Sequence, residues 1–253
     1  MIFGFRNYGN TCYLNSAIQL LCLNPDFYNI ENMKANPDSA IKAIKRTLGK
    51  INKSFIGSRQ QDSGEALLLL LEHYSKQLNN INKYELREVT RVKCKLMICL
   101  HQELSYRKSN AIMLDITAKD LYNCYKNSKN AEHISDGWIC PKCKKETPLA
   151  SKRFFYDNWP QYLIFGLKRF NFNGSKYTKN NSKVSIPFEW NHGYNLIGAI
   201  LHSGSMNGGH YVCIGKKNNK WYLFDDSHVK EINNKNVLNN YLENSYFFLY
   251  KQT

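Results

Sequence analysis

The chain has 253 residues, of which 43% are hydrophobic and 13% aromatic, so it can bury one substantial core and is expected to form a single domain over residues 1–253. No run is apolar and long enough for a membrane helix, and residues 1–6 lack the pattern of a signal peptide, which excludes a membrane-spanning or secreted protein. The net charge of +15 is typical of proteins that bind nucleic acid, an anionic membrane surface or an acidic partner. The lysines are scattered among asparagines, however, and a solvated surface is the preferred interpretation.

Cys12 is the first residue that suggests chemistry. Glycines and asparagines crowd the segment before it, and the apolar spacing of a helix begins directly after it. We therefore expect Cys12 at a helix N-terminus, where the exposed N–H groups stabilise a thiolate. The alternative is a buried cysteine without chemistry, and only a partner base elsewhere in the chain can decide between the two.

The middle of the helical region contains two carboxylates. Residues 30–53 predict one or two amphipathic helices, and residues 58–71 predict a further apolar helix. Asp62 and Glu65 stand three positions apart at its start, so both project from the first turn. Ordinary helix capping explains these residue types as well as a binding role does.

A change to strand patterns after Glu85 brings two cysteine pairs. Strands are predicted around residues 89–98 and 111–116. Cys140 and Cys143 enclose Pro and Lys in a CxxC turn, which is typical of a zinc knuckle. Cys94 and Cys99 are the best candidates for the second pair, although four residues separate them. Cys124, His101 and His133 are the substitutes, and the absence of a secretion signal argues against disulfides.

The remaining chain is rich in predicted strands and contains the candidate base. Strands are expected at residues 161–170, 184–187, 194–202, 221–224 and 246–250. His210 follows a glycine-rich loop and opens a strand, and the strand at 221–224 ends in two carboxylates. A hairpin would place Asp225 beside His210, where it can orient the imidazole. Cysteine, histidine and aspartate would then form a nucleophile, a base and an orienting acid.

These motifs together resemble those of the ubiquitin-specific proteases, cysteine peptidases that remove ubiquitin from proteins. Residues 9–16 are similar to the family's cysteine box, residues 60–65 to its QQDxxE segment, and residues 202–227 to its histidine box. Residues 167–170 and the CxxC turn are also family features. Ala66 departs from the family pattern, which has Phe or Leu after the glutamate.

The resemblance implies an α+β, papain-like cysteine peptidase fold shaped like a right hand. A helical thumb would occupy residues up to about 82, zinc-knuckle fingers about 83–155, and a β-rich palm about 156–253. Cys12 would lie in the cleft between thumb and palm. The chain is short for the family, so accessory domains are expected to be absent.

The resemblance also implies the role of each site residue. Cys12, His210 and Asp225 would form the catalytic triad, with Asp226 as the alternative orienting acid, and Asn7 would stabilise the oxyanion. Asp62 and Glu65 would hold the arginines of ubiquitin's Leu-Arg-Leu-Arg-Gly-Gly end, and Gly209 and Tyr211 would also contact the substrate. His202 would be structural. One structural Zn²⁺ would be bound by Cys94, Cys99, Cys140 and Cys143, and the remaining cysteines would be core or surface thiols.

The implied function is hydrolysis of the isopeptide or peptide bond after the terminal Gly-Gly of ubiquitin, by a monomeric protein of the cytoplasm or nucleus. Three alternatives stay open at this point: a peptidase for a ubiquitin-like modifier, a ubiquitin-binding module that does not cleave, and a basic zinc protein that binds nucleic acid. The second alternative is disfavoured because nucleophile, base and acid are all present.

Overall fold

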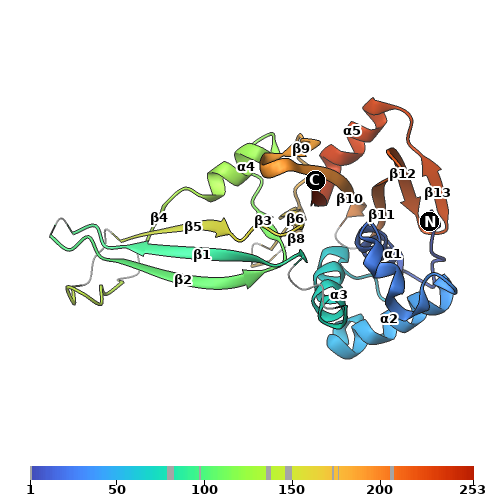
Figure 1. Ribbon diagram of the computed structural model, residues 1–253, viewed down its shortest axis with the longest axis horizontal. Helices are drawn as coiled ribbons and strands as arrows, with labels where there is room; N and C mark the ends of the chain where they lie inside the picture. Colours follow the sequence, from blue (N-terminus) through green and yellow to red (C-terminus); the bar gives the residue numbers. More distant parts are fainter. Residues whose placement is uncertain are drawn as a thin grey trace.

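A computed structural model describes residues 2–78, 83–96, 98–134, 138–145, 150–172, 174–175, 177–205 and 208–253. At one end lie three helices, α1 (Cys12–Leu21), α2 (Pro37–Ile51) and α3 (Ser63–Gln77), connected by the 3₁₀ segments η1 (Pro25–Asn32) and η2 (Lys53–Phe55). Figure 1 shows these helices grouped beside the strands of a large sheet. Within the described ranges, no helix has the length and apolar character needed to cross a membrane.

The large sheet separates two hydrophobic cores. Its strand order is β13-β12-β11-β10-β14-β6-β3, with β9 paired to β10. The bounds are β3 (Ile112–Leu114), β6 (Tyr162–Leu167), β9 (Glu189–Trp190), β10 (Tyr194–Ser205), β11 (Gly208–Lys217), β12 (Lys220–Asp225), β13 (His228–Glu231) and β14 (Ser245–Gln252). Alternate residues point to opposite faces, so Ile200 joins the core under α1 to α3, whereas Ala199 joins the core on the other face. Two further helices, α4 (Leu121–Ser128) and α5 (Lys235–Asn244), cover that second face.

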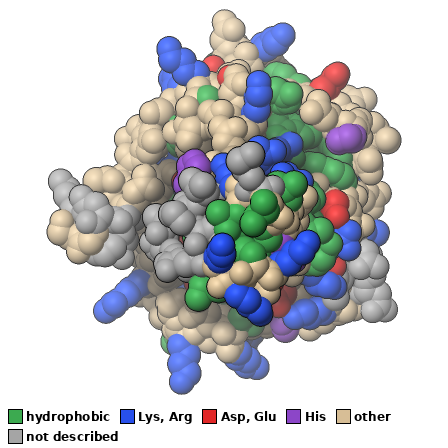
Figure 2. Space-filling view, turned by 90° about the vertical axis from the view of Figure 1, so that its left-hand side faces the viewer, with side chains coloured by type: hydrophobic (Ala, Val, Ile, Leu, Met, Phe, Trp, Pro, Cys, Tyr) green, Lys and Arg blue, Asp and Glu red, His purple; other side chains and the backbone are tan. Residues whose placement is uncertain are grey.

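A smaller sheet extends away from the helices and the large sheet (Figure 1). Its strand order is β2-β1-β5-β4, formed by β1 (Leu86–Lys93), β2 (Gln102–Ser109), β4 (Glu132–His133) and β5 (Ser151–Asp157). A separate two-stranded sheet contains β7 (Phe170–Phe172) and β8 (Tyr177–Lys179). Figure 2 looks at the molecule from the end of the extended sheet and shows Lys and Arg side chains spread around the outline, as the scattered lysines predict.

The expected α+β class is confirmed, and the strand prediction at 184–187 is wrong. Only an isolated bridge between Asp120 and Ser185 forms there. The N–H groups of Val184 and Ser185 donate to Glu243 and Lys119, which lie outside any strand, so no ladder can continue. The sequence analysis also did not predict α4 and α5, which are short and rich in asparagine, a poor helix former.

Parts of some predicted segments lie outside the described residues or next to them. The described part of 94–100 forms a turn instead of continuing the predicted strand. Met97, Asp136, Gly137, Met206 and Asn207 lie outside the described residues, as does residue 82, the expected end of the thumb.

Candidate active site

Cys12 is the first residue of α1, as expected, and it is only 2% exposed. All ten residues of this helix are buried, because it packs against β11 on one side and α3 on another. The preceding Thr11 uses its hydroxyl to accept the N–H of Tyr8 at 2.8 Å, not to cap the helix. The sulfur is therefore held at the junction between the helices and the large sheet.

His210 and Asp225 come from neighbouring strands of that sheet. His210 lies near the start of β11, opposite Ser203 of β10, and Asp225 is the last residue of β12. The Nε2 atom of His210 lies 2.6 Å from Oδ1 of Asp225. This bond fixes the ring orientation. In a neutral ring that donates through Nε2, Nδ1 is the nitrogen left to accept a proton.

The neighbouring carboxylate, Asp226, has different partners. Its Oδ2 accepts the side-chain amide of Asn7 at 2.8 Å, and its Oδ1 accepts that of Asn15 at 2.7 Å. The Oδ1 of Asn7 accepts the backbone N–H of Thr11 at 3.1 Å, which leaves its NH₂ group facing the carboxylate. Asp226 thus fixes the side chain of Asn7, which lies five residues before Cys12. The backbone of Asp226 itself has a left-handed φ of 49°.

Gln60 joins the two sides of the site, and the sequence analysis did not single it out. Its Nε2 lies 3.8 Å from Sγ of Cys12 and also donates to the carbonyl of Gly209. Its Oε1 accepts the N–H of Gly209 at 3.0 Å. One side-chain amide therefore pairs with both backbone groups of the residue before His210 while it touches the candidate nucleophile. The signal was present, since Gln60 opens the motif at 60–65.

Asp62 and Glu65 line a groove of about 670 Å³ beside Gln60. Asp62 caps α3, because its Oδ1 accepts the N–H of Glu65 at 2.7 Å, but the side chain of Glu65 turns to Asn52 at 3.0 Å. Burial raises the pKa of Asp62, and burial together with the charge of Asp62 raises that of Glu65. Within the described part of the chain, neither carboxylate has a cation within ion-pair distance.

His202 and Tyr211 also line this groove, and Gly209 lies against His202. The His202 ring lies 4.4 Å from that of Tyr211, and the Tyr211 hydroxyl donates to Asp62 at 3.5 Å. Burial, with the charges of Lys179 and His210, lowers the pKa of His202 to about 4. A Cβ atom on Gly209 would lie 2.1 Å from Nε2 of His202, so no larger residue fits there without displacement.

Four cysteines gather at the far end of the small sheet. Cys94, Cys99, Cys140 and Cys143 have sulfur atoms that all lie within 4.8 Å of one another, and this group could hold a metal ion. Each pair is followed by a residue with left-handed φ, 48° at Leu100 and 55° at Lys144, so the C-x₄-C segment turns much as the CxxC segment does. Burial works to raise the pKa of Cys140, but N–H groups of the CxxC turn and neighbouring thiols lower it to about 7.

The other cysteines and the alternative ligands lie elsewhere. Cys22, Cys124 and Cys213 are buried in the two hydrophobic cores, and all eight cysteines are free. His101 and His133 do not belong to the four-sulfur group.

The chain is similar to known proteins in sequence and in fold. A family model described as ubiquitin carboxyl-terminal hydrolase matches residues 27–250, a range that begins after Cys12. Ubiquitin carboxyl-terminal hydrolase 36 of Drosophila pseudoobscura pseudoobscura is 28% identical over 314 residues, covering 98% of this chain and 29% of that protein. The Drosophila melanogaster protein of the same name is 28% identical over 302 residues, covering 93% of this chain and 29% of its own length. This chain therefore spans less than a third of these relatives.

Solved structures show the same fold. The SAGA DUB module of Ubp8, Sgf11, Sus1 and Sgf73 bound to monoubiquitin contains a chain that aligns with a TM-score of 0.84 at 22% identity, covering 99% of this chain and 69% of that one. The module bound to ubiquitin aldehyde aligns with a TM-score of 0.81 at 23% identity, with coverage of 99% and 69%. The extent of the family match, together with this fold, shows that the chain belongs to the ubiquitin carboxyl-terminal hydrolase family.

Proposed function

We propose that this protein is a cysteine hydrolase that cleaves the bond after the C-terminal Gly-Gly of ubiquitin. The observation that carries the proposal is Gln60, whose Nε2 lies 3.8 Å from Sγ of Cys12 and also donates to Gly209, the residue before His210. His210 is in turn bonded to Asp225, on the sheet against which α1 packs. The family match and the ubiquitin bound to the similar Ubp8 modules support ubiquitin as the substrate.

In the proposed mechanism, Nδ1 of His210 takes the proton of Cys12, and the thiolate attacks the carbonyl carbon of the last glycine of ubiquitin. The backbone N–H of Cys12 and the side-chain amide of Asn7 stabilise the oxyanion. His210 then protonates the leaving amine, and the same base activates the water that hydrolyses the thioester.

The two adjacent carboxylates are proposed to act separately. Asp225 orients the His210 ring and stabilises its protonated form. Asp226 positions Asn7 by accepting one N–H of its amide, which leaves the second N–H for the oxyanion. This division follows from the bonding partners of each carboxylate.

Substrate selection is proposed to take place in the groove lined by Asp62 and Glu65. Two carboxylates without a cationic partner in the described structure suit the arginines of the ubiquitin tail, because bidentate bonds between guanidinium and carboxylate are strong and directional. Gln60 and Gly209 pair beside Cys12, and a tail that ends in two glycines would bring no side chain against these groups.

Zinc is proposed as the ion held by the four cysteines. A tetrahedral zinc with bonds of about 2.3 Å places its sulfur ligands about 3.8 Å apart, and Sγ of Cys99 lies 3.6 Å from Sγ of Cys140. The ion would join the end of β1 and β2 to the segment before β5 and would take no part in hydrolysis. We also propose that α1 to α3 form the thumb, the small sheet the fingers and the large sheet the palm.

The test is reaction with ubiquitin that carries a C-terminal electrophile. The native chain should form a covalent adduct and Cys12→Ala should form none, while Cys124→Ala, which removes a cysteine far from the cleft, should react normally. An adduct on Cys12→Ala would show that the nucleophile is wrong. A folded native chain that binds ubiquitin without reacting would be a binding module, and preference for a ubiquitin-like probe would change the substrate.

A further inference from the structure

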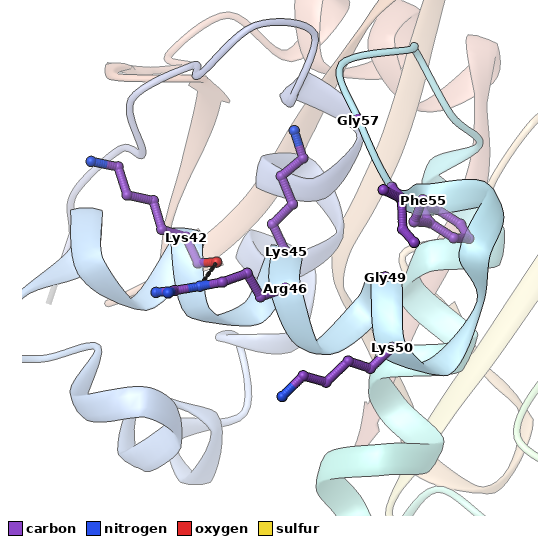
Figure 3. Close-up of a pocket in the computed structure, with 8 residues that line it drawn as sticks. Lys42, Lys45, Arg46, Gly49, Lys50, Phe55 and Gly57 are labelled. Atoms are coloured by element: carbon purple, nitrogen blue, oxygen red, sulfur yellow. Dashed lines mark hydrogen bonds between the residues drawn. The ribbon is translucent and has the colours of Figure 1, made fainter.

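The outer side of α2 carries a groove of about 710 Å³ that the proposed catalysis does not use. One wall is the helix itself, and the other is formed by residues 55–57, at the end of η2 and directly after it. Figure 3 shows Lys42, Lys45, Arg46 and Lys50 projecting from successive turns of the helix, with Gly49 facing Phe55 across the groove.

The charge of this groove is entirely positive. No acidic side chain lines it, and its four cations belong to no ion pair within the described part of the chain. Arg46 and Lys50 are exposed and stand four residues apart, as do Lys42 and Arg46, so like charges face each other along the helix. The Nε of Arg46 donates only to the carbonyl of Lys42, at 3.2 Å. An anionic partner would relieve this repulsion.

The other wall of the groove is apolar. Ile56 is 64% exposed, whereas the neighbouring Phe55 is 1% exposed. A Cβ atom at Gly49 would lie 3.2 Å from Cγ1 of Ile56, so the glycine lets the isoleucine lie against the helix. Gly57 has a φ of 90° and open space around it. The groove thus offers an apolar contact next to a row of cations.

The groove adjoins the candidate active site through the segment that forms its second wall. The carbonyl of Ser58, directly after Gly57, accepts the side chain of Asn10 at 2.9 Å, and Asn10 is two residues before Cys12. The carbonyl of Ser54 accepts Gln61 at 2.7 Å. A polypeptide bound in the groove would lie beside the cleft without filling it.

We propose that this groove binds an acidic polypeptide segment that carries a large apolar side chain. The carboxylates pair with Arg46, Lys50 and their neighbours, while the apolar side chain packs on Ile56. Charge complementarity identifies the partner as anionic, and the apolar wall separates a peptide from a nucleic acid. Nucleic-acid grooves add exposed aromatic rings for base stacking, but the ring of Phe55 is buried.

The test uses fluorescence anisotropy with short labelled peptides of Asp, Glu and Gly that contain one central leucine or, as the comparison, one central serine. The native chain should bind the leucine peptide more tightly than the serine peptide. Arg46→Glu with Lys50→Glu should weaken binding of the leucine peptide by about tenfold or more at low salt. Ile56→Ser should remove the preference for leucine and leave the affinity for the serine peptide unchanged.

The matched control reverses two exposed lysines on the large sheet, Lys216→Glu with Lys230→Glu, and gives the same change in net charge. It should retain binding. Equal loss in the control, equal binding of the two peptides by the native chain, or tighter binding of a single-stranded oligonucleotide with the same dependence on Arg46 and Lys50 would each overturn the proposal. Because binding is measured without hydrolysis, the result is independent of the proposed catalysis.

Discussion

Replacing Asp225 and Asp226 by asparagine, one at a time, separates two carboxylates that are adjacent in sequence. Asparagine preserves the shape of both side chains. At Asp226 it also suits the backbone, because φ is 49° and asparagine adopts this left-handed region more readily than alanine does. The variants therefore differ from the native chain mainly in charge and in hydrogen bonding.

Asp225→Asn should reduce kcat strongly and stability only slightly. The 2.6 Å bond from His210 loses its anionic acceptor, and an amide can present its NH₂ group to the ring and select the wrong tautomer. In hydrolases with an analogous triad such a change lowers kcat by about ten-thousandfold. The side chains of His210 and Asp225 are 43% and 46% exposed, so loss of their charged pair should change the free energy of unfolding by no more than about 1 kcal/mol.

Asp226→Asn should show the opposite balance. Asn7 and Asn15 donate to the carboxylate at 2.8 and 2.7 Å, whereas an amide offers one oxygen, so one of the two bonds is lost. Loss of a hydrogen bond to a charged group costs about 1.5–3 kcal/mol of unfolding free energy. If the bond to Asn7 is lost, kcat should fall by up to about a hundredfold, as for a weakened oxyanion donor.

The assay measures kcat and KM with ubiquitin that carries a C-terminal fluorogenic amide, together with urea unfolding of each variant. The assignment predicts that Asp225→Asn is the slower enzyme and Asp226→Asn the less stable protein. If Asp226→Asn is nearly inactive with native stability while Asp225→Asn retains most of its kcat, Asp226 is the acid that orients His210 and the reasoning fails.

Four further outcomes are expected. Gly209→Ala should abolish cleavage in a chain that still folds, as gel assay and circular dichroism would show, because its Cβ would lie 2.1 Å from Nε2 of His202, which lines the groove. Full activity would mean that His202 can move aside without effect on the site. Burial lowers the pKa of His202 to about 4, so the unfolded chain binds a proton at this residue more readily than the folded chain does. The free energy of unfolding should therefore decrease as the pH falls from about 6.5 toward 4, by up to about 3 kcal/mol. An NMR titration that shows His202 protonating near pH 6.5 would contradict this. Asp62→Asn with Glu65→Gln should raise KM for ubiquitin by about tenfold or more with little effect on kcat. Burial raises the pKa values of Asp62 and Glu65. As the pH falls, KM of the native chain should therefore begin to rise at a pH above the usual carboxyl range. An unchanged KM in either experiment would exclude the two carboxylates from binding. Cys143→Ser or chelation should release one zinc and increase hydrogen exchange in β1 and β5 but not in α1, and release of no metal would refute the zinc assignment.

Much of the fold could be predicted because local signals agree with the global structure. The glycine-rich approach to Cys12 and the apolar run after it specify the start of α1, and Asp62 specifies the start of α3. The paired strands β11 and β12 follow from their apolar runs and the loop between them. These elements are long or well capped, so tertiary contacts reinforce what the sequence already favours.

The features that were not predicted depend on contacts between residues distant in sequence. Val184 and Ile186 look like strand residues, but their segment meets α5 and the loop before α4 instead of another strand. Helix α5 depends on its asparagine cap and on packing of Leu238, not on helix propensity. Gln60 opens the motif at 60–65, but its contacts could not be predicted from that motif, because its partners Cys12 and Gly209 lie 48 and 149 residues away.

The turn at Asp226 also holds the beginning of the chain. The N–H of Phe5 donates to the carbonyl of Asp226 at 2.8 Å, and a Cβ atom on Gly4 would lie 2.3 Å from the same oxygen. An affinity tag fused ahead of the first residue would therefore be tethered only a few positions from Asn7, the proposed oxyanion donor, where it would crowd the incoming conjugate. A tag placed after Thr253, whose N–H donates to the carbonyl of Gly193 in the 3₁₀ segment η4 (Asn191–Gly193), is the better choice for purification and for immobilising the protein on a sensor surface.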